Sequence, residues 1–446
     1  MNDYFPLAET AVNRCRTKGA TDAEVYIEHG DDFSVFVCEG SIESLKQSAF
    51  KGLGLRVFLG DKSGFAFTND FSKPSIESIV DAAFHFSQLS DVDVCNKLPA
   101  KVPDRYSDLE LFDPCLQNIS AEDKIALTRS LEAMALAKDR RIIRTEGAGF
   151  FSSSSTIHFV SSKGSHGSYP ATLAGISVSP VAESNGDRIS ESWYSYDRFF
   201  DKVETPDQVA AIAVKRTLRL IGARKIRTTK ADIILEPSCG ISFLSSFFSL
   251  INGDNVNRGL SVLRNDLGKQ IAPDFVTIVD DGQLRGRIGS RPFDGEGIAT
   301  ARHVVVEKGV MKKFLYDTKA GLRAGVESTG HARRRYDSDI TIGSNNFFVA
   351  AGLSSPEEII KKTDRGLWVT KLMGFGFDPV SGMFSYGAAG VWIEQGYLAY
   401  PVHEVVIASD IKHMLANIQE VGNDLRFRGP VACPTLKISD VTIAGS

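Results

Sequence analysis

The sequence predicts an α+β fold, in which an N-terminal mixed α/β domain with an antiparallel sheet precedes a strand-rich C-terminal domain. Helical and strand patterns are intermixed along the 446 residues, without the regular alternation of strands and helices that a parallel sheet requires. Short alternating apolar runs separated by glycine-containing turns favour antiparallel pairing. We place the boundary in the basic stretch 223–230, which lacks apolar periodicity, so the two domains are expected at 1–222 and 223–446.

In the N-terminal domain, the helical periodicity of apolar residues is clearest between Ile76 and Phe84, and Ser120 with Asp123 resembles a capping box. Helices are therefore expected at 4–18, 74–88, 120–138 and from 205 to about 222. Alternating apolar residues predict strands at 23–27, 33–37, 53–59, 65–68, 156–160, 175–181 and 189–196. The proline-containing, highly charged segment 90–117 is expected to be a long connection.

In the C-terminal domain, apolar runs flanking Gly309 and Gly396 predict two hairpins, one of 303–306 with 310–315 and one of 391–394 with 397–400. Further strands are expected at 231–236, 275–279 and 402–408. Helices are expected at 241–251, 318–325, 356–363 and 410–420.

The composition is that of an ordinary globular protein, with 43% hydrophobic and 24% charged residues. The net charge of −4 and the absence of a long basic run mean that direct nucleic-acid binding is not expected. The longest charge-free stretch, 237–253, is shorter than the ~20 apolar residues of a spanning helix, so no membrane association is expected. Six cysteines without CxxC pairs and the lack of a secretory signal predict a cytoplasmic location.

Common catalytic motifs are absent from the sequence. No two of the eight histidines have HExxH spacing, and the only His-Glu dipeptide, His403-Glu404, lies in an apolar run that resembles a strand. Neither a GxSxG nucleophile elbow nor a phosphate-binding glycine motif occurs.

Asp294 and Glu296 are a candidate pair of carboxylates. Residues at i and i+2 face one side of an extended segment, where two carboxylates could bind a cation or transfer protons. They could equally accept hydrogen bonds from turn amides or pair with Arg287, Arg291 or Arg302. Because no partner histidine accompanies them, the structural role is favoured.

The densest polar cluster contains Ser328, Thr329 and His331 and ends at Arg335. Arginine forks in such a cluster could hold an anionic group or a peptide carboxylate, whereas the alternative is a solvated positive face. Ser385 and Tyr386 belong to the glycine- and aromatic-rich stretch 375–390, which is expected to be a long loop. Such loops carry ligand contacts or simply reverse the chain.

Several separated motifs, in this order, resemble the TldD/PmbA family. They are PFDGEG at 292–297, STGH at 328–331, GLWVTKLMG at 366–374, GAAG at 387–390, YPV at 400–402 and GNDL at 422–425. The resemblance is weak in the first half of the chain and strong from about Ile233. It implies a C-terminal domain with curved, barrel-like sheets. It also implies an intracellular peptidase system that acts on peptides or unfolded segments and usually assembles as dimers.

The family has two branches, and they differ in their metal ligands. The TldD branch carries HExxxH in the helix before a Gly-Asp pair and uses it, with a later cysteine, to hold zinc. Counting back from Gly253-Asp254 places Leu244, Ser245 and Ser249 at those positions, and Cys433 alone does not restore the missing set. The chain therefore resembles the PmbA (TldE) branch, and no metal ligand or other cofactor is expected in it.

The resemblance implies a subunit of a cytoplasmic metallopeptidase system, with zinc in a TldD-type partner. Its expected partners are that TldD-type chain, a second copy of itself, or both, and a peptide substrate. The chain alone is expected to be inactive because HExxxH is absent. The alternatives are an autonomous metallopeptidase with unrecognised ligands and a binding protein that modulates partners such as DNA gyrase. The substrate-passage candidates are Asp294, Glu296, Ser328, Thr329, His331, Arg335, Ser385 and Tyr386.

Overall fold

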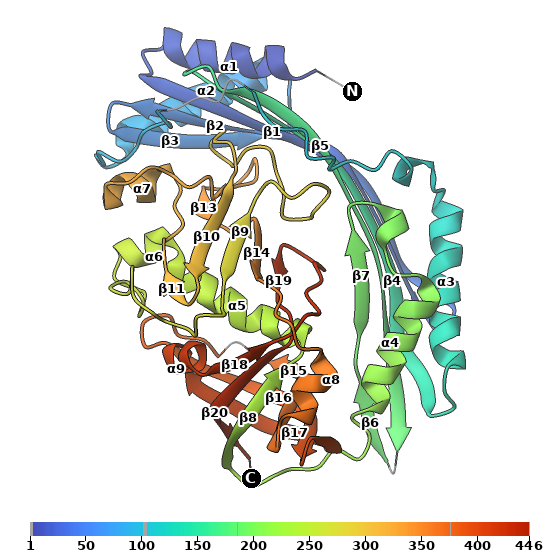
Figure 1. Ribbon diagram of the computed structural model, residues 1–446. Helices are drawn as coiled ribbons and strands as arrows, with labels where there is room; N and C mark the ends of the chain where they lie inside the picture. The colour runs from blue at the N-terminus through green and yellow to red at the C-terminus, as the bar shows by residue number, and fades with distance from the viewer. Residues whose placement is uncertain (1–2, 101–104, 185, 375, 446) are drawn as a thin grey trace.

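The computed structural model describes residues 3–100, 105–184, 186–374 and 376–445. Its architecture confirms the predicted fold class. A long, curved antiparallel sheet from the first half of the chain bends around the second half, which lies on its concave side and contains a closed barrel (Figure 1). Within the described residues, none of the helices has the length and apolar content that crossing a membrane would require.

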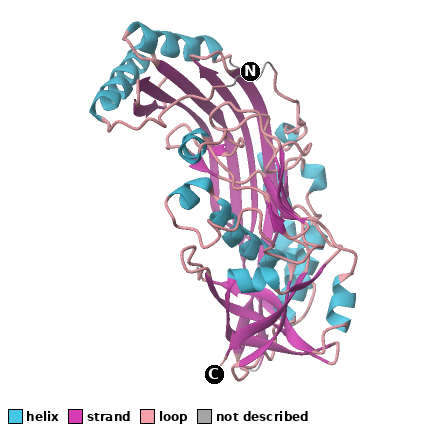
Figure 2. Cartoon of the chain, turned by 60° about the vertical axis from the view of Figure 1, so that its left-hand side comes forward, coloured by secondary structure: helices cyan, strands magenta, loops and turns pink. Residues whose placement is uncertain are grey.

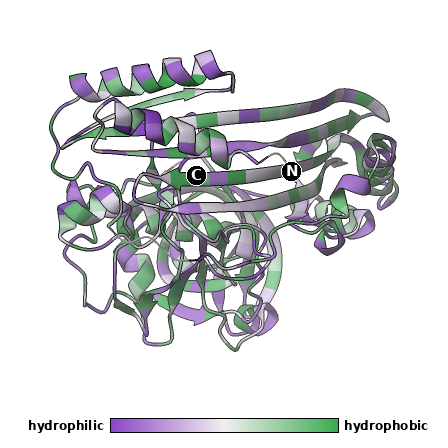
Figure 3. Cartoon of the chain, turned by 90° about the horizontal axis from the view of Figure 1, so that it is seen from above, coloured by the Kyte–Doolittle hydropathy of each residue, from purple (hydrophilic) through white to green (hydrophobic). Residues whose placement is uncertain are grey.

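The curved sheet has the strand order β3-β2-β1-β4-β5-β6, and β7 also pairs with β5. Its strands are β1 (Asp22–Cys38), β2 (Ser41–Leu59), β3 (Lys62–Thr68), β4 (Ile142–Ser161), β5 (His166–Ser184), β6 (Asp187–Ser190) and β7 (Trp193–Asp197). Figure 3 shows hydrophobic and hydrophilic residues alternating along these long strands, as expected when successive side chains point to opposite faces.

Two sequence-based strand predictions are wrong in detail. The predicted strands 23–27 and 33–37 are one continuous strand, because β1 pairs with both β2 and β4 along its whole polar middle. Gly30 permits this close pairing, since an added Cβ would lie 2.1 Å from the carbonyl oxygen of Ser154. The predicted strand 189–196 is divided into β6 and β7, because Glu191 between them donates its N–H to Thr217 Oγ1 instead of a ladder partner.

Four helices cover the convex face of the curved sheet in two pairs (Figures 1 and 2). The pairs are α1 (Phe5–Thr17) with α2 (Lys73–Leu89), and α3 (Ala121–Ala137) with α4 (Pro206–Leu218). Each pair packs its apolar face on the strands beneath it and forms a separate core. The predicted cap of α3 is present, since the Ser120 side chain accepts a hydrogen bond from the Asp123 N–H.

The C-terminal half contains a closed five-stranded barrel. Its strand order is β17-β16-β15-β8-β20, and pairing of β17 with β20 closes the circle. The strands are β8 (Thr229–Leu235), β15 (Arg365–Met373), β16 (Met383–Glu394), β17 (Tyr397–Asp410) and β20 (Leu436–Ala444), with β18 (Ile418–Val421) added beside β20. The predicted helix 410–420 is therefore too long: α9 (Ile411–Ala416) ends where the chain pairs with β20.

A smaller sheet lies between the barrel and the curved sheet (Figure 1). Its order is β11-β10-β9-β14-β19. The strands are β9 (Ile278–Asp281), β10 (Arg302–Glu307), β11 (Val310–Met311), β14 (Asn346–Val349) and β19 (Val431–Ala432). The predicted strand 275–279 begins late, because Val276 donates its N–H to the Pro273 carbonyl in a turn.

The remaining elements of the C-terminal half are short, apart from one long helix. They are α5 (Pro237–Ile251), α6 (Gly253–Asn257), α7 (Thr318–Ala324), α8 (Pro356–Lys361) and the hairpin of β12 (Ala332–Arg333) with β13 (Thr341–Ile342). Phe243 and Phe247 of α5 are fully buried in the main core. Phe293 packs against Phe159 of β4 and Tyr26 of β1, which attaches the C-terminal half to the concave face of the curved sheet.

Candidate functional site

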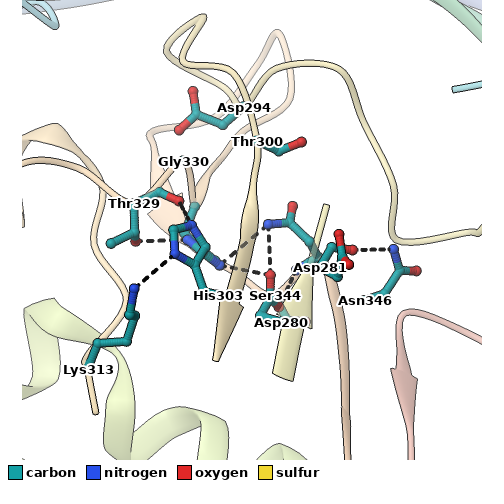
Figure 4. A network of polar contacts seen from close by, with 12 residues as sticks. Asp280, Asp281, Asp294, Thr300, His303, Lys313, Thr329, Gly330, Ser344 and Asn346 are labelled. Atoms are coloured by element: carbon teal, nitrogen blue, oxygen red, sulfur yellow. Dashed lines mark hydrogen bonds and ion pairs between the residues drawn. The ribbon is translucent and has the colours of Figure 1, made fainter. Parts of the chain in front are cut away.

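Five of the predicted site residues form a polar cluster in two segments, 294–296 and 328–331, which the hydrogen bond from the Ala332 N–H to Asp294 joins. Figure 4 shows Asp294 and Thr329 of this cluster beside the small sheet. Asp294, Glu296 and His331 are buried, with at most 2% of their surface exposed. Ser328 and Thr329 are half-buried, in the segment between α7 and β12. Glu296 and His331 are 35 positions apart in the sequence. The structure therefore brings residues of two separate motifs into one network.

His331 is held between a carboxylate and a hydroxyl. Its Nε2 lies 2.9 Å from Asp280 Oδ1, and its Nδ1 lies 2.8 Å from Thr329 Oγ1. Because the carboxylate can only accept, Nε2 of His331 carries a proton and donates it to Asp280. Burial opposes ionisation of Asp280, but the hydrogen bonds from His331 and Asn345 hold its pKa below the ordinary value.

The sequence of hydroxyl, imidazole and carboxylate groups resembles the catalytic triad of hydrolases, but substrate cannot reach it. Thr329 Oγ1 already accepts the N–H of Tyr316 at 2.7 Å. Both His331 and Asp280 have no exposed surface. A nucleophilic Thr329 would have to attack a substrate carbonyl with an oxygen that already accepts a hydrogen bond, and its base, His331, is not accessible to substrate. The arrangement therefore fits a structural role better than a nucleophilic one.

His303 of β10 lies beside this arrangement. Its Nε2 is 2.9 Å from the Thr329 carbonyl oxygen, and Lys313 Nζ is 3.4 Å from its Nδ1. Burial, together with nearby His331 and Lys313, lowers the pKa of His303 to about 4. The ring is therefore neutral at physiological pH and donates its Nε2 proton to the carbonyl.

Asp294 binds backbone amides. Its Oδ1 accepts the N–H groups of Glu296 and Ile298, and its Oδ2 accepts that of Ala332. Burial, with a contribution from the Glu296 carboxylate, raises the pKa of Asp294 to about 7. The sequence left open whether Asp294 binds a cation, transfers protons, pairs with an arginine or accepts hydrogen bonds from turn amides. In the structure it accepts hydrogen bonds from turn amides.

Glu296 faces the other domain. Its Oε1 lies 3.0 Å from Arg56 Nη2 on β2, and its Oε2 accepts the Thr318 N–H at the start of α7. Arg56 also contacts the buried carboxylate of Glu24, which lies 2.5 Å from Arg334 Nη1. Two carboxylates and two guanidinium groups thus form a buried ionic bridge between the curved sheet and the C-terminal half. Among the ion pairs of the described residues, Glu296 pairs with Arg56 and not with Arg287, Arg291 or Arg302, the three arginines considered from sequence.

The other three predicted site residues lie outside the cluster. Arg335 is exposed and pairs with Asp337 at 3.4 Å. Ser385 and Tyr386 are in β16, so the predicted loop 375–390 is strand from Met383 onward, because these residues pair with β17. Residue 375 of that predicted loop lies outside the described residues.

Helix α5 carries the positions that the family resemblance assigns to zinc ligands. Leu244 is fully buried in the core, Ser245 is exposed, and Ser249 donates its hydroxyl to the Ser246 carbonyl. Cys433 packs against the same helix, since a Cβ added to Gly240 would lie 2.7 Å from its Sγ. Gly240 and Leu244 are one helical turn apart, so Cys433 lies near the first of the ligand positions.

These residues do not fit a zinc ion. An alkyl side chain and two hydroxyl groups offer neither imidazole nor thiolate, which zinc prefers. Burial raises the pKa of the Cys433 thiol, which opposes the thiolate form. Among the residues that the structure describes, no group of three or more His, Cys, Asp or Glu side chains is arranged to hold a metal ion.

A cavity of about 500 Å³ opens beside the first turn of α5. Its walls come from β7 and α4 of the curved sheet side and from β15 and the segment 424–435 of the barrel side. The guanidinium carbons of Arg216 and Arg428 lie 4.9 and 4.7 Å from the ring centroid of Trp193. The cavity therefore combines aromatic surface with charged groups, as binding pockets commonly do.

Sequence reasoning missed this cavity. Its charged lining is largely internally paired: Arg216 binds Glu236 at 2.7 Å, and Lys371 binds Glu191 at 2.5 Å. The residues come from separate stretches of sequence, and no local spacing marks them as neighbours. Two features of the sequence could have indicated the cavity. They are the tryptophan at position 193 in a polar strand and the GLWVTKLMG motif, which includes Trp368 and Lys371.

The fold defines an α+β protein with two dissimilar halves, a curved antiparallel sheet and a half that contains a closed barrel. Three family models match nearly the whole chain: PmbA/TldA metallopeptidase domain 1 at residues 23–85, the central domain at 115–221 and the C-terminal domain at 228–445. The chain belongs to the PmbA/TldD metallopeptidase family.

Individual relatives agree with this assignment. The chain is 33% identical to Metalloprotease PmbA of Escherichia coli O157:H7 over 425 residues, which cover 95% of this chain and 92% of that protein. A proposed modulator of DNA gyrase from Bacteroides thetaiotaomicron has a crystal structure that superposes with a TM-score of 0.91 at 25% identity, covering 100% of both chains. TldE from Thermococcus kodakarensis shares the fold, with a TM-score of 0.89 at 21% identity over 98% of this chain and 100% of that one.

Proposed function

We propose that this chain is a PmbA/TldE-like subunit of a cytoplasmic peptidase system, in which it is the zinc-free partner of a TldD-type chain. The system would process or degrade peptides and unfolded segments. The six free cysteines suit a reducing compartment. The metal-dependent step belongs to the partner chain, and this chain contributes surface to the substrate passage.

The observation that carries the proposal is the chemistry of α5. At the three ligand positions the helix offers Leu244, Ser245 and Ser249, and the first of these is part of the hydrophobic core. Restoring an imidazole there would require burying a polar ring in an apolar environment, which costs free energy unless it finds a partner. The proposal therefore assigns this helix a packing role and not a metal-binding one.

The cavity beside α5 supports a role in holding substrate. Trp193 and Trp368 offer aromatic surface to side chains, and the neighbouring charged groups offer hydrogen bonds to a peptide backbone. This cavity is lined from both halves of the chain, and the ion pairs of Arg216 with Glu236 and of Arg428 with Glu204 join the halves beside it. The eight candidates from sequence stay predictions, and the structure favours the α5 cavity as the place to test first.

The proposal is tested by comparing the chain alone with the chain mixed with a TldD-type partner, using an unstructured peptide as substrate. We expect cleavage only in the mixture, and we expect Trp193→Ala to reduce it while the assembly still forms. The control is Tyr397→Ala, which removes a 76% exposed aromatic ring of β17 that does not line this cavity. Cleavage by the lone chain would contradict the proposal and favour the autonomous peptidase. Failure of both preparations, combined with binding to DNA gyrase, would favour the modulator.

A further inference from the structure

A basic cavity of about 590 Å³ lies where the chain passes from the curved sheet into the barrel. One wall is the segment 224–229, between α4 and the first residue of β8, at the lower end of the barrel in Figure 1. This segment belongs to the basic stretch 223–230 at the domain boundary. Among the described residues, four cationic side chains and one carboxylate line the cavity: Arg224, Lys225, Arg227 and Arg365 against Glu394.

The backbone of this segment is fixed by the barrel. Arg224 donates its N–H to the Pro401 carbonyl of β17 at 3.1 Å. The Gly445 N–H, just after β20, donates to Thr228 Oγ1 at 3.2 Å. Gly445 also packs closely, since an added Cβ would lie 1.8 Å from the Ile226 carbonyl oxygen. The basic side chains therefore project from a backbone whose position is well defined.

Aromatic rings orient two of the arginines. The guanidinium carbon of Arg224 lies 3.4 Å from the ring centroid of Tyr400, and that of Arg365 lies 5.5 Å from the ring centroid of Trp392. Arg365 Nη2 also donates to Thr229 Oγ1 at 3.1 Å. A guanidinium group that stacks on a ring keeps N–H groups available at its edge, because these lie in its own plane. Both arginines can therefore donate hydrogen bonds to a ligand while the rings hold them.

Three of the four cations have no counterion. Among the residues that the structure describes, Arg224, Arg227 and Arg365 form no ion pair, and the Arg227 side chain forms no hydrogen bond either. The fourth cation, Lys225, pairs with Glu404 at 2.7 Å. Like charges in one cavity repel one another, so an anion placed between them lowers the electrostatic free energy.

We propose that this cavity binds a phosphate group, either as the free ion or as the monoester of a small organic molecule. A phosphate monoester carries about −1.5 to −2 charges at pH 7 and three strong acceptor oxygens. It suits three arginines better than a carboxylate, which has a single charge and two oxygens. Ile226 and Trp392 add apolar surface to the wall, and the volume lies in the range of small-molecule sites.

The inference goes beyond the proposed function, because this basic cavity and the α5 cavity lie at opposite ends of β8. Thr229 begins the strand and lines the basic cavity, whereas Glu236 follows the strand and lines the α5 cavity. The 7 residues of the strand separate them by roughly 20 Å, at ~3.3 Å per residue. The two proposals can fail separately, since peptide cleavage in a mixture says nothing about phosphate binding by the lone chain.

The test is isothermal titration calorimetry of the full chain with inorganic phosphate, phenyl phosphate and acetate at constant ionic strength. We expect both phosphates to bind and acetate not to bind. Tighter binding of phenyl phosphate would support a monoester as the ligand, and equal or tighter binding of inorganic phosphate would support the free ion. Absence of binding by both phosphates, or equally tight binding of acetate, would overturn the proposal.

Arg227→Gln is the main variant, because its side chain has no described partner and its replacement should leave the fold intact. It should raise the Kd for phosphate by about tenfold or more, as should Arg224→Gln, since each removes charge-assisted hydrogen bonds. Lys230→Gln is the matched control on the same stretch: this exposed lysine pairs with Asp440 and does not line the cavity. It should change the Kd by less than about twofold. Equal effects of the three substitutions would indicate a diffuse positive surface and overturn the proposal.

Hydrogen exchange measured by mass spectrometry locates the ligand independently. Saturating phosphate should slow exchange in peptides that cover 224–229 and 397–402, and it should leave the first turn of α5 unchanged. Slower exchange found only in other segments would overturn the assignment to this cavity. An unstructured oligonucleotide is the last ligand to test. If it binds through the same arginines while neither small phosphate binds, the surface contacts nucleic acid and the proposal fails.

Discussion

His331 Nε2 and Asp280 Oδ1 lie 2.9 Å apart, and neither side chain has exposed surface. The contact joins the segment after α7 to the central strand of the small sheet, β9. Asn345 N also donates to the second oxygen of Asp280, at 2.8 Å. Both oxygens of the carboxylate thus accept hydrogen bonds, and the proton between the two side chains is on Nε2 of His331.

We predict that Asp280→Asn lowers the free energy of unfolding by roughly 2–4 kcal/mol. The new amide can still accept the His331 proton, but its NH₂ group then faces the Asn345 N–H, and a buried donor is left unpaired. Chemical denaturation measures the change. Asp337→Asn, which alters an exposed carboxylate paired with Arg335, is the control and should cost under ~0.5 kcal/mol. Equal effects from the two substitutions would contradict this account of the cluster.

Removing Arg56 should weaken the attachment between the two halves of the chain. Arg56→Met leaves the buried carboxylates of Glu24 and Glu296 without one of their cations, and loss of one partner of a buried ion pair costs about 3–5 kcal/mol. Arg14→Met removes a partly exposed pair with Glu77 and should cost at most about 1 kcal/mol. Denaturation reports the free energy, and limited proteolysis reports whether the halves separate first. If Arg56→Met is as mild as the control, the bridge does not hold the halves together.

Asp294 should make stability depend on pH. Its pKa is raised to about 7, so the folded state holds the proton more tightly than the unfolded chain. The stabilising contribution is therefore complete below the ordinary pKa of 3.8 and is lost as the pH rises through about 7. Asp294→Asn cannot titrate, so its free energy of unfolding does not show this loss. The wild type should be the more stable protein, and the difference between the two free energies of unfolding should narrow by roughly 2 kcal/mol from about pH 5 to about pH 8.

Denaturation curves of both proteins at the two pH values measure that gap. Asp317→Asn should show the same trend to a smaller extent, because burial and Glu296 raise the pKa of Asp317 only to about 6. A gap that stays constant with pH would show that Asp294 does not titrate in this range.

The cysteines should differ sharply in reactivity. Cys115 is exposed, whereas Cys15, Cys239 and Cys433 are buried. Burial raises the pKa of Cys15 and of Cys239 to about 12 and that of Cys433 further, and the thiol form reacts slowly. Mass spectrometry after brief alkylation of the native chain should find label on Cys115 first and on these three only after unfolding. Rapid native labelling of Cys433 would mean that it is a reactive, ligand-like thiolate.

Much of the fold could be predicted from local patterns. The helix from Ile76 to Phe84 follows from apolar periodicity, and the start of α3 follows from the Ser120 cap, because both depend on neighbours in sequence. The length of β1 could not be predicted in this way. Its polar middle, around Gly30, is strand because β2 and β4 pair with it from both sides. Pairing with strands distant in sequence determines that this segment is a strand, and the local sequence pattern does not indicate that pairing.

The same limit applies to the site. The motifs at 292–297 and 328–331 indicated that Asp294 and His331 matter, but not that one binds turn amides and the other binds Asp280. Arg56 and Glu24, which complete the ionic bridge, lie more than 200 positions away from Glu296 in an unremarkable strand pattern. Long-range charge pairing leaves no periodic trace in one sequence, so the bridge became visible only in the structure.

The central claim, that this chain is the zinc-free member of its system, is tested most directly by metal analysis of the purified lone chain. The chain is loaded with zinc, freed of loosely bound metal by dialysis, and measured by mass spectrometry of the metal. We predict far less than one zinc per chain, and no loss of zinc on replacing Cys433 by Ser. One tightly bound zinc per chain, lost in the Cys433→Ser variant, would contradict the account.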